Sequence, residues 1–275
     1  LRNSSAASDV YKRQIYCVAN FFLGMGMAFT HQYRFAAAES VSKDKVPRAI
    51  SIILLGGIVS AFIGPSVANF SKDLFSNHMY IGSYLSLAAL TFLPTIFFLF
   101  YKNTSKIELS FKYSGRSYLE LVSQPRFLQA VISSAFGYAI MTFLMTGTPL
   151  SMHVIEGISL NKTSIVIQIH VACMFLPSLI AGNLVKKIGH SKMMYVGVGL
   201  YCITVVISLF DQSFLNYMLA LVFLGFGWNF LFISGTSLLV LTYKEEEKYR
   251  AQGFNDFVVY SCLLYTSPSP RDLRK

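Results

Sequence analysis

The stretch 221–235, LVFLGFGWNFLFISG, decides the fold class of this chain. It lies within an apolar segment at 216–241, which is longer than the about 20 residues that a helix needs to cross a bilayer. Glycine and aromatic residues inside such a segment are tolerated better in membrane helices than in helices of soluble proteins. The segment also lacks the strict alternation of apolar and polar residues that marks a membrane barrel strand. The stretch therefore predicts a membrane-spanning helix.

Similar apolar segments precede it along the chain, separated by short polar loops. They lie at 15–33, 49–68, 80–100, 127–149, 164–183 and 193–210, and an eighth begins near 254 and is cut short within a few residues. Only 13% of the 275 residues are charged, against about a quarter in soluble domains. We therefore predict an all-α integral membrane protein, a helix bundle with seven complete spans and the start of another.

Lysine and arginine are distributed unequally between the loops. Fifteen fall in the loops at 34–48, 101–126, 184–192 and 242–253, and only two fall in the three loops between them. Because positively charged loops stay in the cytoplasm, the four rich loops are predicted to be cytoplasmic. The formal net charge of +10 is thus explained by membrane topology, and we expect no nucleic-acid partner.

The sequence carries no pattern that indicates enzymatic chemistry. Its four cysteines form neither a CxxC site nor a disulfide framework, and no group of His, Cys and carboxylate residues has the spacing of metal ligands. It also lacks the Gly-Lys-Ser/Thr loop that binds phosphate, so ATP-driven transport is not indicated. We expect a protein that is not an enzyme and that uses no cofactor or metal.

The two ends of the chain are polar, in contrast to the apolar segments between them. DVYKRQ (9–14) and CLLYTS (262–267) can be encoded by DNA strings that are reverse complements of each other offset by one base, those of adapters used in transposase-based sequencing libraries. We interpret 1–14 and 262–275 as adapter-derived artefacts. We expect 15–261 to be an internal piece of a longer protein.

The sequence contains the segments GNLVKKIGHSK at 182–192, GGIVSAFIGPSVAN at 56–69 and NFFLGMGMA at 20–28. These three segments resemble motifs of the major facilitator superfamily of secondary transporters. GNLVKKIGHSK at 182–192 is similar to the family's cytoplasmic loop Gly-x-Leu-x-Asp-Arg-x-Gly, with Lys186 in place of the aspartate. GGIVSAFIGPSVAN at 56–69 resembles the antiporter motif of the fifth helix, and NFFLGMGMA at 20–28 resembles a motif of the fourth. The residues that this resemblance assigns to gating and loop motifs are Gly182, Leu184, Lys187, Gly189, Gly64 and Pro65.

The resemblance implies a partial major facilitator fold, from about helix 4 to helix 10 plus the start of helix 11. Residues 15–100 would be the end of the N-terminal six-helix half, 101–126 the central cytoplasmic loop, and 127–261 the C-terminal half. The implied function is secondary active transport of a small organic solute by alternating access, coupled to a proton or another ion. The implied setting is a monomer in the lipid bilayer of the bacterial inner membrane.

Polar and aromatic residues inside the spans are candidates for the substrate cavity. Helical spacing places Asn20 and His31 on one face, Tyr138 and Thr142 on another, and the only tryptophan, Trp228, lies at mid-span beside Asn229. His170 lies deep in its span, where an ionisable group is a functional hypothesis by default. For Trp228 and Asn229 the alternative is packing with the amide capping a backbone group, and for His170 it is a neutral ring bonded to a carbonyl.

Charged residues near the cytoplasmic ends of the spans have simpler interpretations. We expect Arg34 to extend to the headgroups and Asp256 to cap the start of a helix at 254, with pairing of Arg250 and Asp256 as the alternative. The run KEEEK at 244–248 is interpreted as a solvated loop segment.

The number of complete spans leaves one other class of function open, a seven-helix receptor or a retinal protein. A retinal protein needs a lysine inside a helix, and every lysine here lies in a predicted loop or a terminal stretch. Binding that recruits a partner without movement of solute would distinguish a receptor from a transporter.

Overall fold

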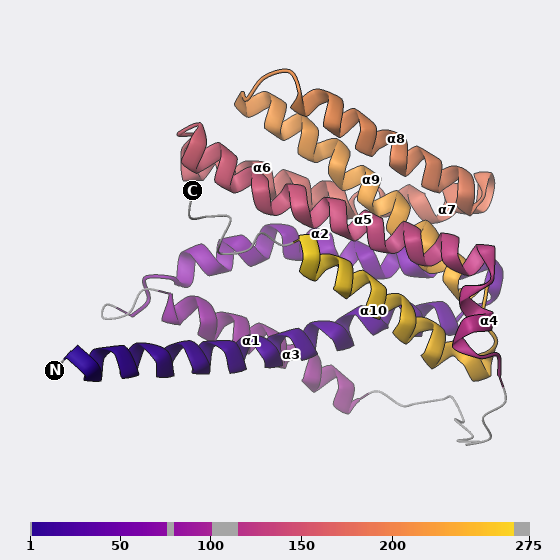
Figure 1. Ribbon diagram of the computed structural model, residues 1–275, viewed down its shortest axis with the longest axis horizontal. Helices are drawn as coiled ribbons and strands as arrows, with labels where there is room; N and C mark the ends of the chain where they lie inside the picture. Colours follow the sequence, from indigo (N-terminus) through magenta and orange to yellow (C-terminus); the bar gives the residue numbers. More distant parts are fainter. Residues whose placement is uncertain (1, 76–79, 101–114, 267–275) are drawn as a thin grey trace.

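The computed structural model describes residues 2–75, 80–100 and 115–266, and every regular element among them is helical (Figure 1). The first part contains α1 (Arg2–Glu39), α2 (Val46–Ser71) and α3 (Ile81–Leu99). The second contains α4 (Tyr118–Val122), α5 (Pro125–Leu150), α6 (Leu160–Phe175), α7 (Ser178–Ile188), α8 (His190–Ser208), α9 (Phe214–Val240) and α10 (Lys248–Thr266). Short irregular turns of helix lie at η1 (Lys43–Lys45), η2 (Ser151–Ile155) and η3 (Glu245–Glu247).

The described residues contain five helical segments that are long and apolar enough to cross a membrane. They are Lys43–Ala68, Pro125–Ile155, Leu160–Ile188, His190–Ser208 and Phe214–Val240. The spans predicted at 15–33 and 80–100 lie in α1 and α3, which are helical but are not among the five. In α1 the polar residues Asn20, His31 and Gln32 lower the hydropathy of the segment. The predicted all-α membrane bundle is confirmed.

Several helices begin earlier or end later than the sequence predicts. The predicted loop 101–126 contains α4 and the start of α5, while its residues 101–114 lie outside the described ranges. Ser117 starts α4 through a capping box, in which Glu120 N donates to its hydroxyl and its own N–H donates to the Glu120 carboxylate. The predicted loop 184–192 shrinks to a turn at Gly189, whose φ of 88° favours glycine. The origin assigned to the two terminal stretches stays a prediction.

Helix α9 is the centre of the bundle and packs against α5, α6 and α8 (Figure 1). Glycines let its backbone approach these neighbours closely. A Cβ at Gly225 would lie 2.9 Å from the His170 carbonyl oxygen on α6, and one at Gly227 would lie 3.0 Å from the Gly197 carbonyl oxygen on α8. Gly225 and Gly227 are therefore positions of close helix packing.

Helix α1 joins the bundle only through its C-terminal part. Its side chains from Lys12 to Thr30 are exposed, including those of Phe21 and Phe29, whereas Arg34, Phe35 and Ala38 are buried. In Figure 1, α1 and α3 lie on one side of the view, α5 to α9 lie on the other, and α10 passes between them. Among the described helices, α1 packs mainly against α2 and to a smaller extent against α9, while the side chain of Arg34 connects it to Asp256 of α10.

Candidate functional site: an aromatic cluster beside a buried ion pair

An aromatic cluster lies where α1, α5, α6, α9 and α10 meet. Trp228 and Phe232, one turn apart on α9, stack with ring centroids 4.9 Å apart and an interplanar angle of 13°. Tyr138 from α5 contacts both rings edge-on, at 5.3 Å from Trp228 and 5.2 Å from Phe232. The cluster consists of His31, Tyr138, Phe175, Trp228, Phe232 and Tyr260. It gathers three of the predicted cavity residues, His31, Tyr138 and Trp228, around one point.

His31 connects the cluster to the first part of the chain. Its ring lies 5.8 Å from that of Tyr138 and 5.7 Å from that of Tyr260, both in edge-on geometry. Tyr260 follows Asp256 by four residues, so both lie on the same face of α10. This spacing is the signal by which the sequence could have indicated Tyr260, which sequence reasoning missed.

A buried ion pair lies next to the cluster. The Arg34 guanidinium donates through Nη2 to Asp256 Oδ1 at 2.5 Å, and Gln32 Nε2 donates to Asp256 Oδ2 at 2.6 Å. Arg34 is only 3% exposed, and its guanidinium carbon lies 4.6 Å from the ring centroids of both Phe35 and Phe232. The pair therefore fixes α1 against α10 beside the aromatic rings.

This pair corrects three predictions. Arg34 does not extend to the headgroups, and Asp256 does not cap a helix, because α10 begins at Lys248 and places Asp256 in its interior. Asp256 forms its ion pair with Arg34 and not with Arg250, which donates to the Arg116 carbonyl oxygen at 2.8 Å. Six residues separate Arg250 from Asp256, so the two point about 120° apart around the helix and meet different neighbours.

His170 and Asn229 each hydrogen-bond to a backbone carbonyl in the core, while His170 Nε2 and Asn229 Oδ1 have no partner among the described residues. His170 Nδ1 lies 2.8 Å from the Leu221 carbonyl oxygen, which can only accept, so Nδ1 carries the proton. Asn229 donates through Nδ2 to the Met174 carbonyl oxygen and to Ser178 Oγ, each at 2.7 Å. These contacts match the neutral histidine and the capping amide that were the alternatives to ligand binding.

The other two predicted cavity residues lie away from the cluster. Asn20 is on the exposed part of α1, where its Nδ2 donates to the Tyr16 carbonyl oxygen at 2.8 Å. Thr142 is half-buried on α5, one turn beyond Tyr138, and its carbonyl oxygen accepts from Thr146. Helical spacing alone did not reveal that α1 is exposed at the depth of Asn20.

The predicted gating motif lies where α7 meets α2. Gly182 is buried, and a Cβ there would be 2.7 Å from Ser51 Oγ and 2.8 Å from the Arg48 Cα. Leu184 packs against an apolar cluster at this contact, Lys187 is exposed, and Gly189 forms the turn into α8. Gly64 has open space around it and lies, like Pro65, inside α2.

The neighbouring Lys186, which replaces the family's aspartate, lies 3.4 Å from Asp44 in an exposed ion pair. Asp44, from the turn between α1 and α2, thus compensates the positive charge that Lys186 places on this loop.

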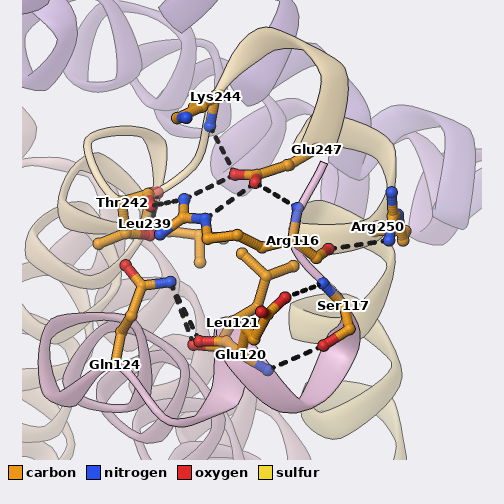
Figure 2. Close-up of polar contacts among 10 residues, drawn as sticks. All are labelled: Arg116, Ser117, Glu120, Leu121, Gln124, Leu239, Thr242, Lys244, Glu247 and Arg250. Carbon is orange, nitrogen blue, oxygen red and sulfur yellow. Dashed lines mark hydrogen bonds and ion pairs between the residues drawn. The ribbon is translucent and has the colours of Figure 1, made fainter. Parts of the chain in front are cut away.

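A second ion pair ties the start of α4 to the turn between α9 and α10 (Figure 2). Arg116 donates to the Glu247 carboxylate from Nε at 2.8 Å, from Nη2 at 2.6 Å and from its backbone N–H at 2.8 Å. Nη2 also donates to the Thr242 carbonyl oxygen at 3.0 Å, and Lys244 N donates to Glu247 at 2.9 Å. We call Arg116, Thr242, Lys244 and Glu247 the loop clamp.

The electrostatics of the loop clamp correct the interpretation of KEEEK as a fully solvated run. Glu247 is 0% exposed, and hydrogen bonding from Arg116 lowers the pKa of its carboxyl group from 4.5 to about 2. The same bond raises the pKa of Arg116. Among the described residues, no group of three or more His, Cys, Asp or Glu side chains is arranged to hold a metal ion.

Comparisons with known proteins agree with this architecture. The profile of the Major Facilitator Superfamily matches residues 11–264. The riboflavin transporter RfnT of Brucella anthropi is 34% identical over 255 residues, which cover 92% of this chain and 64% of that protein. Two uncharacterized transporters of the same type from Bacillus subtilis, YddS and YdeG, are 26% and 27% identical and are covered over 59% and 58% of their length.

These relatives have two consequences. The chain spans about three-fifths of the length of each, and all three are described as transporters, so a seven-helix receptor is not favoured. Bacterial relatives and several helices of membrane length make it a multi-pass integral membrane protein of the bacterial plasma membrane. With a matching profile over almost its whole length, the chain belongs to the Major Facilitator Superfamily of membrane transporters.

Proposed function

We propose that this protein moves a small planar aromatic solute across the membrane, with riboflavin as the first candidate. The aromatic cluster carries the proposal. Trp228 and Phe232 stack on each other, Tyr138 contacts both rings edge-on, and the three come from two helices in the centre of the bundle, so a flat solute would extend or enter an existing aromatic stack. Offset stacking on such faces is the interaction that a flat conjugated ring system prefers.

The relative supports this class of solute. RfnT, a riboflavin transporter, is 34% identical to the chain, and riboflavin carries a flat three-ring system. A stacking site also suits transport, because stacking holds the solute without a strong directional bond that would slow its release. In this proposal the protein is a monomer that catalyses no covalent chemistry.

We further propose that transport proceeds by alternating access of two helical halves. The resemblance assigns α1 to α3 to the first half and α5 to α10 to the second, so the Arg34–Asp256 pair joins the two halves. Rocking of the halves around a central site would have to separate this pair. The pair would then close one side of the pathway when it is formed and open that side when it is broken.

Asp256 is the candidate for coupling to an ion. It is a carboxylate inside the bundle, 13% exposed at its side chain, and its oxygens accept from Arg34 and Gln32. Protonation would remove the charge that holds the guanidinium, so a proton taken up from one side would weaken the closed arrangement. This links a proton gradient to the movement of the halves.

Uptake of labelled riboflavin by a bacterium that lacks its own importer tests the proposal. Expressed from its complete gene, the protein should support uptake that collapses when a protonophore removes the proton gradient. Uptake that instead depends on ATP with the gradient absent would contradict ion coupling. Absence of riboflavin uptake in cells that contain the protein in the membrane would contradict the choice of solute.

A further inference from the structure

We propose that Arg34 recognises one edge of the bound solute and so determines which aromatic rings are accepted. The inference deepens the proposed function and rests on it. The solute would be a planar heterocycle in which a carbonyl oxygen and a ring nitrogen lie next to each other on one edge. Both atoms are hydrogen-bond acceptors. The isoalloxazine ring of riboflavin has this arrangement at its C4 carbonyl and N5.

The first observation is that Arg34 keeps unused donors although it is buried. Nη2 donates to Asp256, but Nε and Nη1 have no partner among the described residues, and the residue is 3% exposed. Buried donors without partners are rare in folded proteins because each carries the cost of its lost hydration. A charged group left in this state indicates that another molecule completes its hydrogen bonds.

The second observation is the arrangement of the Arg34 donors that Asp256 does not use. A guanidinium group has two edges with a pair of parallel N–H donors, and Nη2 belongs to both of them. Asp256 Oδ1 occupies one hydrogen of Nη2, so one edge retains both of its donors. Two parallel donors match two acceptors on a rigid ring, and arginine binds the carbonyl oxygen and ring nitrogen of guanine in this way.

The third observation is the position of the group relative to the aromatic rings. The guanidinium carbon lies 4.6 Å from the centroid of Phe232, whose ring is stacked on that of Trp228. Arg34, Phe232 and Trp228 thus form one continuous stack. A flat solute that lies beside the guanidinium, in its plane and over the ring of Phe232, would have its edge within reach of the free donors. The Nε1 of Trp228 also has no partner among the described residues, which makes it the competing donor.

The test compares riboflavin with 5-deazariboflavin, in which a C–H group replaces N5 and the ring shape is kept. Both compounds compete with labelled riboflavin for the purified protein expressed from its complete gene. Loss of one hydrogen bond to a charged donor should weaken binding of the deaza compound about tenfold. Arg34→Lys keeps the positive charge beside Asp256 but lacks the two parallel N–H donors of a guanidinium. The preference of this variant for riboflavin over the deaza compound should therefore fall below about threefold. Arg48→Lys, which changes an exposed arginine on α2, should keep the tenfold preference.

Trp228→Phe provides a second variant that does not depend on the folding of Arg34→Lys. It keeps an aromatic face and removes the indole N–H, so the tenfold preference should persist. A preference that disappears in Trp228→Phe, or one that persists in Arg34→Lys, would overturn the role of Arg34. Equal binding of both compounds to the unchanged protein would overturn this inference alone. A protein that binds neither compound would overturn the proposed function as well.

Discussion

Arg34 and Asp256 are separated by 222 positions in the chain, yet they form an ion pair at 2.5 Å that is almost completely buried. The pair connects α1 to α10 and lies against the ring of Phe232. Burial makes such a pair costly to break on one side only, because the remaining charge is left without a partner. We therefore place it at the centre of both the packing of α1 and the proposed gating.

Asp256→Asn should impair the protein far more than Asp44→Asn. The first change leaves Arg34 buried without its counter-charge and should lower the free energy of unfolding by about 3 kcal/mol and riboflavin uptake at least about tenfold. Asp44 pairs with Lys186 at the surface, both side chains being more than half exposed, and such pairs contribute little to stability. Thermal unfolding of the purified variants and uptake in cells measure the two effects. Equal behaviour of both variants would show that the buried pair has no special role.

The loop clamp should make the protein resistant to moderate acid. Because the pKa of Glu247 is about 2 when folded and 4.5 ordinarily, its stabilising effect is complete above pH 4.5 and is lost as the pH falls towards 2. The difference in unfolding temperature between the unchanged protein and Glu247→Gln should therefore be constant above pH 4.5 and shrink below it. A difference in unfolding temperature that is as large at pH 2.5 as at neutral pH would contradict the lowered pKa of Glu247.

Removing Arg116 should be more damaging than removing the charge of Glu247. Arg116→Met leaves a carboxylate that is 0% exposed without its ion partner, at a cost of about 3–5 kcal/mol. Glu247→Gln leaves a guanidinium whose side chain is 32% exposed and can be hydrated, so its cost should be smaller. Unfolding measured at pH 7 in the same detergent compares the two. The reverse order would contradict the burial of Glu247.

Substitution by alanine should change the free energy of unfolding in different ways at two glycines of α8. At Gly197 a Cβ would lie 2.8 Å from Leu231 Cγ and 3.0 Å from the Gly227 carbonyl oxygen, so Gly197→Ala should push α8 away from α9 at a cost of about 1–3 kcal/mol. A Cβ at Gly199 meets nothing within 4 Å, and Gly199→Ala should be neutral or stabilise by up to about 1 kcal/mol. Unfolding temperatures of the two variants provide the comparison. Tolerance of alanine at Gly197 would mean that the helices are packed less tightly than described.

His170→Asn should preserve proton-driven uptake. The asparagine Nδ2 takes the place of the histidine Nδ1 and can donate to the Leu221 carbonyl oxygen, while it cannot bind a proton. His170→Phe removes the donor and should lower the free energy of unfolding by about 1 kcal/mol. Uptake driven by an imposed pH gradient in vesicles is the measurement. If His170→Asn abolishes that uptake but still exchanges riboflavin, His170 is the proton site.

Local pattern was enough to predict the membrane bundle and part of the site. The apolar segment around Trp228 predicted α9, and the position of that tryptophan at mid-span singled out a residue that does lie in the aromatic cluster. Spacing also placed Tyr138 on a face of α5 that meets α9. These predictions succeed because hydropathy and helical period depend only on neighbours in the sequence.

The pairing of charges could not be predicted in the same way. The partner of Asp256 comes from the other end of the chain, and the partner of Glu247 precedes it by 131 positions. Glu247 lies in the predicted loop 242–253 and Asp256 lies just after it, where solvated charges are the usual case. Their burial depends on which helices meet. Helix α10 begins at Lys248, earlier than predicted, so Asp256 lies inside the helix and not at its end.

Binding of riboflavin to the purified protein, followed by flavin fluorescence, tests the role of the aromatic cluster most directly. Stacking on Trp228 should quench the emission in a saturable way. Trp228→Leu should weaken binding about tenfold, since stacking of a ring on an aromatic side chain is worth about 1–3 kcal/mol. Phe230→Leu, which changes a buried aromatic residue outside the cluster, should bind as the unchanged protein does. Unchanged affinity and quenching in Trp228→Leu would show that the solute binds elsewhere.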